Sequence, residues 1–112
     1  MARLTSRFLV DLLLRRTQAA GGFAAVLATG DERAGSLLVQ CSARGVPGPL
    51  LERRFSLDGT YVWEAVGPGA DEDEDARAAY RARRRKADPD LWIVELDIAD
   101  TQRLVAEWSA LT

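Results

Sequence analysis

Apolar side chains recur at helical spacing near the start of the chain, over residues 5–20. Leu4, Phe8 and Leu12 are four residues apart, and further apolar residues lie beside them. Gly21 follows, and glycine commonly occupies the left-handed position at which a helix ends. The apolar arc of this predicted helix is wider than one face of a sheet covers. We expect the surplus to pack against the last helix of the chain or against a second copy.

Five short apolar stretches bounded by turn residues predict β-strands. Residues 23–29 are apolar on both faces, which favours a central strand. Asp58-Gly59 is typical of a tight hairpin turn, whereas residues 43–49, with two glycines and two prolines, are predicted to be a loop. Because the connections between the first four strands are short, we expect antiparallel pairing. The predicted strands are residues 23–29, 36–42, 50–56, 61–66 and 91–96.

Two further helices are predicted in the second half of the chain. One covers residues 73–87 and ends ahead of Pro89, since the residue before a proline rarely stays helical. The other reaches about Leu111, with Asp97 or Asp100 as the candidate for its N-terminal cap.

The order of these elements indicates the fold class. A helix, four strands, a helix, a strand and a helix do not alternate regularly, as the βαβ units of a parallel sheet would. We therefore expect a single α+β domain over residues 1–112, with a mainly antiparallel sheet of four or five strands. An N-terminal helix, a second helix before the last strand and a C-terminal helix are expected to pack on one face of that sheet.

Composition removes several kinds of catalytic and metal site. The chain has no histidine, which is the commonest general base and the commonest metal ligand in proteins. Its one cysteine, Cys41, allows neither an intramolecular disulfide nor a zinc site, which needs three or four Cys or His ligands. Cys41 is flanked by apolar residues, so we expect a small buried hydrophobe. We expect no metal and no cofactor.

Carboxylates are the remaining catalytic candidates. Asp88 lies two residues before Asp90, and Glu95 lies two residues before Asp97, on one face at the end of the fifth strand. Exposed structural acids are far commoner than catalytic pairs, which need a cleft and a shifted pKa. We therefore expect a protein that is not an enzyme, and we keep a carboxylate-only enzyme as an alternative.

Charge is unevenly distributed along the second predicted helix. Acidic residues 71–75 lead into it, and basic residues that include Arg81, Arg84 and Arg85 crowd its end. The helix dipole favours this arrangement without any ligand. A net charge of −2 gives no general attraction for nucleic acid, and no aromatic residue interrupts the arginines. The three arginines are a candidate anion or nucleic-acid surface, with nucleic acid the less favoured partner.

Aromatic residues suggest a second kind of surface. Trp63 and Trp92 lie on predicted strands, and Arg53 lies on a neighbouring one. On an open sheet face they would form a stacking surface with Arg53 or Arg54. The alternative, which we favour, is that both tryptophans belong to the core.

Several segments resemble a known family. They are residues 2–4, 13–16, 19–21 and, most specifically, 88–95, with the sequence DPDLWIVE. Together they are similar to a family of short uncharacterised bacterial proteins, a domain of unknown function with the family number 1491. The resemblance covers most of residues 2–97 and weakens in the final helix. It implies a bacterial, cytoplasmic protein and brings with it no activity, cofactor or catalytic residue.

The same segment predicts a corner of the fold. Pro89 ends the second helix, Asp90 can brace the turn, and Trp92 opens the fifth strand. Asp88, Asp90 and Trp92 are therefore a candidate corner, which we interpret as structural first and as a binding site second.

We expect a non-enzymatic protein–protein interaction or self-association module. The candidate partner surface is the surplus arc of the first helix, at Phe8, Leu9 and Leu13. The expected partner is a second copy, as a homodimer, or another protein. No stretch approaches the roughly 20 apolar residues of a membrane span, so we expect no membrane partner. The lone cysteine fits a cytoplasmic location.

Overall fold

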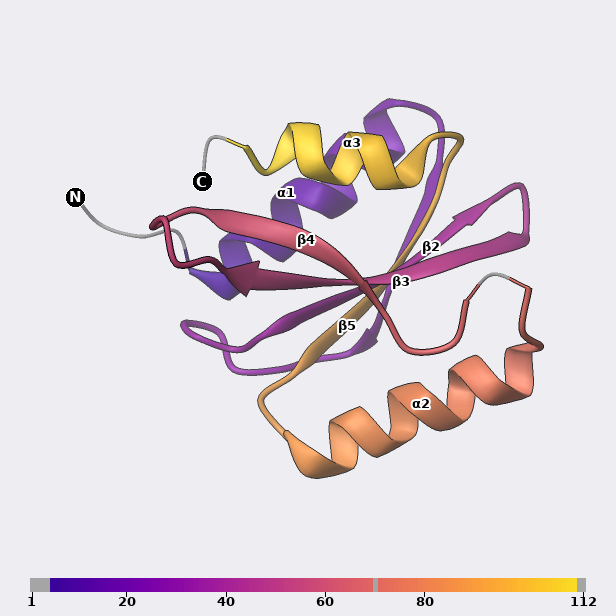
Figure 1. The fold of residues 1–112 in the computed structure, drawn as a ribbon. Helices are drawn as coiled ribbons and strands as arrows, with labels where there is room; N and C mark the ends of the chain where they lie inside the picture. The colour runs from indigo at the N-terminus through magenta and orange to yellow at the C-terminus, as the bar shows by residue number, and fades with distance from the viewer. Residues whose placement is uncertain (1–4, 70, 111–112) are drawn as a thin grey trace.

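The apolar stretches of the sequence form a five-stranded sheet with helices on both sides (Figure 1). This computed structural model describes residues 5–69 and 71–110. None of the helices in those two ranges is both long enough and apolar enough to cross a membrane. The elements are α1 (Ser6–Ala19), β1 (Phe23–Ala28), β2 (Leu37–Ala43), β3 (Val46–Phe55), β4 (Tyr61–Val66), α2 (Glu74–Ala87), β5 (Trp92–Asp97) and α3 (Thr101–Trp108).

The sheet has the strand order β1-β5-β2-β3-β4. β5 pairs parallel with β2, and every other neighbouring pair is antiparallel, which confirms the α+β class. The prediction that residues 23–29 form a central strand is wrong. β5 takes the internal position, and β1 is an edge strand on which Phe23 is 61% exposed. Apolar side chains on both faces of β1 therefore do not mean burial on both faces.

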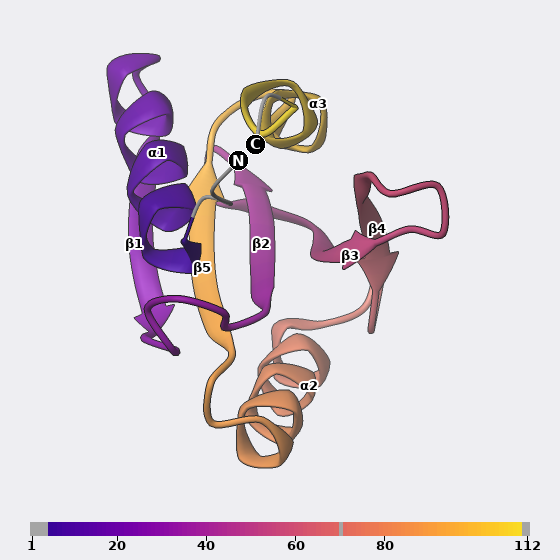
Figure 2. The same cartoon turned by 90° about the vertical axis from the view of Figure 1, so that its left-hand side faces the viewer.

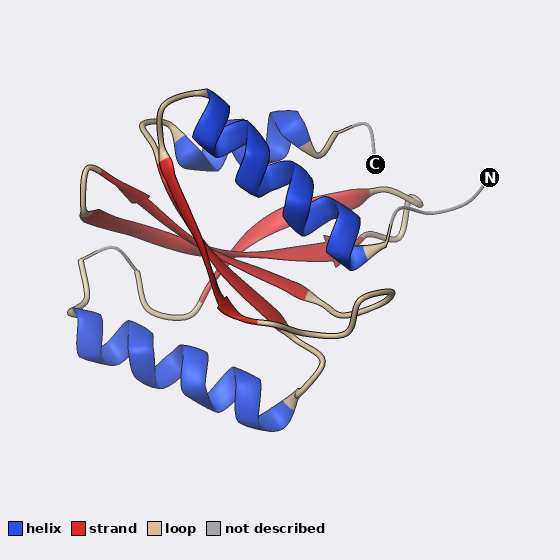
Figure 3. Ribbon diagram, turned by 180° about the vertical axis from the view of Figure 1, so that it is seen from behind, coloured by secondary structure: helices blue, strands red, loops and turns tan. Residues whose placement is uncertain are grey.

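The two faces of the sheet carry two separate apolar clusters. On β2, Leu37 and Val39 face α1 and α3, whereas Leu38 faces α2, as the period of two requires. The expectation that all the helices pack on one face is wrong, since α2 lies on the side opposite α1 and α3 (Figure 3). The reason is that Ile93 and Leu50 make the second face apolar as well, and Tyr80 of α2 covers them.

Side-chain caps set some of the helix ends but not all. The Thr5 hydroxyl accepts a hydrogen bond from the Phe8 N–H at 3.1 Å, and Gly21 ends the first helical segment with φ of +90°. Asp100 precedes α3 but makes no side-chain cap bond. Asp97 does not cap α3 either, because its carboxylate accepts the N–H groups of the β2–β3 turn. Leu4 and Leu111, which the sequence pattern counts in the first and last helices, lie outside the described residues.

The predicted loop over residues 43–49 is mostly strand. β2 and β3 are joined by a tight turn at Arg44 and Gly45, and β3 begins at Val46. Pro47 and Pro49 are tolerated because β4 pairs with β3 only from Leu50 onward. The missing proline N–H groups therefore cost no hydrogen bond to β4.

Arginine side chains, and not only apolar ones, dock α2 on the sheet. The Arg84 guanidinium donates two hydrogen bonds to the Glu52 carboxylate, at 3.0 and 2.8 Å, and a third to the Tyr80 hydroxyl at 2.8 Å. The hydrogen bonds to Glu52 are the main cause that raises the pKa of Arg84. Arg81 donates to the Gln40 side chain at 3.0 Å. The helix thus compensates its shallow apolar stripe with polar contacts to β2 and β3.

Breaking the contact between Arg84 and Glu52 is expected to destabilise the fold. Arg84→Ala leaves the Glu52 carboxylate, on a residue only 8% exposed, with one hydrogen bond from Arg54 in place of three from two guanidinium groups. We expect the free energy of unfolding in urea to fall by about 2–3 kcal/mol, less than for a fully buried pair because the Arg84 side chain is 26% exposed.

The matched control is Arg83→Ala, one residue away on the exposed side of α2. The free energy of unfolding of this variant is expected to fall by less than about 1 kcal/mol, the value of an exposed contact with the Tyr80 ring. Equal losses in the two variants would show that the contact with Glu52 does not anchor α2.

Candidate functional site

The β3–β4 ribbon, residues 50–66, is the part of the sheet least covered by helices. β4 lies at the outer edge of the sheet, on the side away from β1 (Figure 2). Within residues 5–69 and 71–110, no strand pairs with the outer edge of β4. Four large apolar side chains of the ribbon are exposed, namely Phe55, Leu57, Tyr61 and Val62. An open edge beside exposed apolar side chains is typical of a surface that binds another chain.

A cleft of about 610 Å³ lies between this ribbon and α3. Its walls include Arg53, Tyr61 and Trp63 from the ribbon and Ser109 from the segment after α3. A second hollow of about 370 Å³ separates the ribbon from the start of α1 and shares Arg53, Phe55 and Tyr61 with the first. These three residues therefore line both hollows.

Stacked rings and a guanidinium give the ribbon a defined shape. Arg53 Cζ lies 3.8 Å from the centroid of the Tyr61 ring, and the Phe55 ring meets Tyr61 nearly edge-on at 5.0 Å. Trp63 donates its indole N–H to the Ser109 hydroxyl at 2.7 Å. Burial lowers the pKa of Arg53 from its ordinary value. Such a surface can bind apolar and acidic groups.

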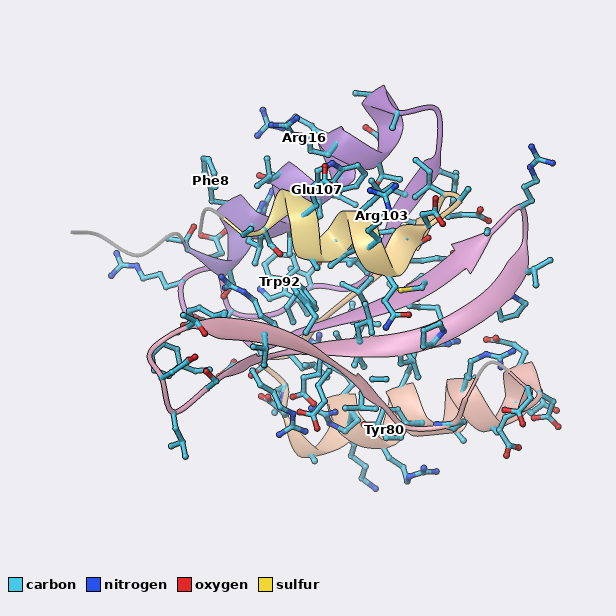
Figure 4. All side chains as sticks on the ribbon, turned by 45° about the horizontal axis from the view of Figure 1, so that its top comes forward. Phe8, Arg16, Tyr80, Trp92, Arg103 and Glu107 are labelled. Atoms are coloured by element: carbon cyan, nitrogen blue, oxygen red, sulfur yellow. The ribbon has the colours of Figure 1, made fainter. Side chains whose placement is uncertain are left out.

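The stacking surface expected from the sequence is realised only in part. Arg53 and Trp63 are direct partners across β3 and β4. Trp92 is 2% exposed and lies between the helices and the sheet (Figure 4). Arg53 covers the ring of Tyr61, a residue that was not among those expected at this surface from the sequence. The two-residue alternation on either side of the Asp58-Gly59 turn carries the signal that would have found it.

Only one of the three residues predicted as the partner surface of the first helix is open to a partner. Leu9 and Leu13 are at most 1% exposed and belong to the core under α1. Phe8 is 49% exposed and lies on the outer side of α1 (Figure 4). The surplus apolar arc is therefore mostly buried within the chain itself, where α3 packs beside α1.

The arginines predicted as an anion surface are turned toward the sheet. Arg81 bonds to Gln40 and to the Glu74 carboxylate, and Arg84 bonds to Glu52. Arg85 donates to the backbone carbonyls of Thr29 and Leu91, at 2.7 and 2.9 Å. An anion would have to compete with these internal acceptors for each guanidinium.

The predicted corner is a packed junction between chain segments. The Asp90 carbonyl accepts the Asp31 N–H at 3.0 Å, and the Trp92 indole donates to the Asp31 carbonyl at 2.7 Å. A Cβ atom added at Gly30 or Gly35 would lie 2.1 or 2.2 Å from the Asp90 oxygen. Asp88 Oδ1 accepts the Asp90 N–H at 3.1 Å, a local contact that braces the turn. These contacts agree with a structural corner.

The second predicted acid pair is divided between different environments. Asp97 is bonded to the backbone N–H groups of Arg44 and Gly45, at 2.6 and 2.8 Å. Glu95 makes no hydrogen bond or ion pair with any residue that the structure describes. No group of three or more possible metal ligands occurs among the described residues.

Cys41 is expected to be unreactive in the folded protein. It is 3% exposed, and burial raises the pKa of its thiol from 9.0 to about 12. At neutral pH iodoacetamide should alkylate the urea-unfolded chain and leave the native chain unmodified, as mass spectrometry would show. Because the folded-state pKa is the higher one, the stability linked to this thiol is full below pH 9.0 and is lost as the pH rises toward about 12. Equal alkylation of native and unfolded chains would contradict this.

Comparisons with known proteins identify relatives of this arrangement. A search of curated proteins finds no match. The crystal structure of a DUF1491 family protein from Caulobacter crescentus CB15 is 32% identical, with a TM-score of 0.79, and the alignment covers 88% of this chain and 92% of that one. An NMR structure of a DUF1491 family protein from the same organism is 33% identical, with a TM-score of 0.75 over 90% of this chain and 91% of that one.

A third similar structure is the solution structure of protein Atu0922 from A. tumefaciens. It is 33% identical, with a TM-score of 0.71 over 88% of this chain and 89% of that one. The family model described as protein of unknown function (DUF1491) matches residues 4–106, which extends the resemblance seen in the sequence into α3. The chain therefore belongs to the DUF1491 family.

Proposed function

We propose that this chain is a non-enzymatic self-association module that binds a second copy of itself along the edge of β4. The single observation that carries the proposal is the open β4 edge with its exposed apolar side chains. An antiparallel β4 from a second copy would satisfy the outer N–H and C=O groups and extend the sheet. Among the described residues, those that line the neighbouring cleft carry arginine, aromatic and hydroxyl side chains but no carboxylate or thiol, which suits binding better than catalysis.

A second copy suits this edge because an antiparallel pair of identical strands is self-complementary. Arg54 lies across from Val62 on the ribbon, and Glu64 follows two residues later. In a two-fold arrangement centred on Trp63, Glu64 of one copy lies beside Val62 of the other copy. Arg54 of that other copy is the β3 partner of the same Val62. Opposite charges then share a row across the joined sheet, which favours this register.

The other edge of the sheet is less suited to pairing. β1 has a register irregularity between Val26 and Ala28, and such bulges interrupt the regular row of backbone groups. β4 pairs with β3 without a register shift and carries neither proline nor lysine, the residues that commonly block edge pairing. Self-association through β4 also explains why the apolar side chains of the ribbon are left uncovered.

Sedimentation velocity over a concentration series tests the proposal. We expect the wild-type chain to form a dimer at high micromolar concentration, because strand-edge interfaces of this size are usually weak. Val62→Lys adds a charge to the β4 edge and should shift the dissociation constant upward by about tenfold or more.

The matched control is Val26→Lys on the opposite edge strand. The exposed fractions of the two valines are similar, 44% for Val62 and 40% for Val26. The control variant should dimerise like the wild type. A wild-type chain that stays monomeric at high micromolar concentration would refute self-association. A Val26→Lys chain that alone loses dimerisation would assign the contact to β1 instead.

A further inference from the structure

Two carboxylates lie on the sheet face that α2 covers, and they differ in their hydrogen-bond and ion-pair partners. Glu52 on β3 is 8% exposed and accepts two hydrogen bonds from Arg84 and one from Arg54. Glu95 lies on the internal strand β5, between Ala25 of β1 and Gln40 of β2, and is partly buried. Of the residues that the structure describes, none donates a hydrogen bond to Glu95 or forms an ion pair with it. A partly buried charge without a partner needs a physical explanation.

Glu95 lies in the lining of a cleft of about 370 Å³ on this face. Side chains of β2 and β5 line it together with residues of β1, of the β2–β3 turn and strand β3, and of α2. The lining residues are Leu27, Gln40, Ser42, Gly45, Pro47, Glu74, Arg81 and Glu95. The cleft lies on the opposite face of the sheet from the hollows that border the β3–β4 ribbon and α3.

A second polar group of the cleft also lacks a partner. Ser42 is 6% exposed, and its hydroxyl oxygen is buried without a hydrogen bond among the described residues. Ser42 is two residues after Gln40 on β2, and Gln40 is the direct partner of Glu95 on β5. The unbonded hydroxyl and the unpaired carboxylate therefore lie on adjacent strands of one cleft. Buried hydroxyl groups are normally bonded, so this one points to a ligand.

The other polar groups of the cleft are already bonded to one another. The Gln40 amide donates to the carbonyls of Cys41 and Gly48, at 2.9 and 3.1 Å, and its oxygen accepts from Arg81. Arg81 also forms an ion pair with Glu74 at 2.6 Å. The charges of Arg81 and Glu74 thus offset each other, and the charge of Glu95 is left over. The ligand that this arrangement calls for is a hydrogen-bond donor with one positive charge.

We propose that this cleft binds a small primary amine, protonated, on a short apolar chain. The ammonium group donates to the Glu95 carboxylate and to the Ser42 hydroxyl, and the apolar chain lies against Leu27 and Pro47. An anion is disfavoured because Glu95 would repel it while Arg81 is bonded to Gln40 and Glu74. A metal ion is disfavoured because the described residues offer no group of three acidic or sulfur ligands. The site is independent of the β4 edge.

Titration of the ¹⁵N-labelled chain with n-butylammonium chloride, followed by ¹H–¹⁵N correlation spectra, tests the proposal. We expect saturable shifts of backbone amides around Ser42 and Glu95, with none from sodium butyrate or sodium chloride at equal ionic strength. Glu95→Gln keeps the shape of the side chain and removes its charge, so the dissociation constant should rise by about tenfold or more. Ser42→Ala should raise it by a smaller factor.

Glu107→Gln is the matched control, since Glu107 is an exposed acid on α3 that lies outside the cleft, and this variant should bind with the affinity of the wild type. Glu95→Gln is expected to fold, because losing an unpaired, partly buried charge is not destabilising. The proposal is overturned if butyrate causes the same shifts, if binding does not saturate, or if Glu95→Gln binds as tightly as the wild type. N-acetyl-lysine methylamide is the final arm, and tighter binding of this compound than of butylammonium would overturn the free amine in favour of a lysine of a partner protein.

Discussion

The parallel pairing of β5 with β2 determines which surfaces of the sheet must be covered. It places β5 between β1 and β2, with Trp92 and Val94 on one face of the sheet and Ile93 on the other. Both faces of the internal strands then bury apolar area, at roughly 25 cal/mol per Å². α1 and α3 cover one face and α2 covers the other, so the three-layer arrangement follows from the position of β5 (Figure 1).

The sheet face under α2 is only partly apolar, so polar side chains take part in the contact between α2 and the sheet. Leu38 and Leu50 form a small apolar cluster beside Gln40 and Glu52, and a helix with only an apolar stripe would leave these polar groups buried without partners. The arginines of α2 provide the missing donors. The same principle singles out Glu95, which lies on this face and forms no ion pair with any guanidinium that the structure describes. Binding at that cleft and pairing at the β4 edge therefore depend on different parts of the sheet.

Local features of the fold could be predicted from the sequence, and non-local ones could not. The end of the first helical segment at Gly21 and the Asp58-Gly59 hairpin depend on neighbouring residues, and the structure has both. The strand order depends on Phe23 meeting Asp97, which no local pattern specifies. Helical spacing also cannot distinguish a solvated arginine from one that bonds to the sheet. The orientation of the Arg84 side chain toward the sheet could therefore not be predicted from the sequence. The stacking of Arg53 on Tyr61 was not predicted, because the sequence pattern was interpreted as placing Arg53 beside the tryptophans.

The position of β5 also has a consequence for the order in which the fold can form on the ribosome. β2, β3 and β4 follow one another in the chain and can pair as soon as each emerges. β1 emerges before them, but its only strand partner within residues 5–69 and 71–110 is β5, which is synthesised after all of them. Until β5 emerges, β1 and the edge of β2 that will pair with β5 both lack the strand that lies between them in the sheet. Closure of so long a loop is slow, so the apolar surface of β1 stays exposed in the nascent chain during this interval.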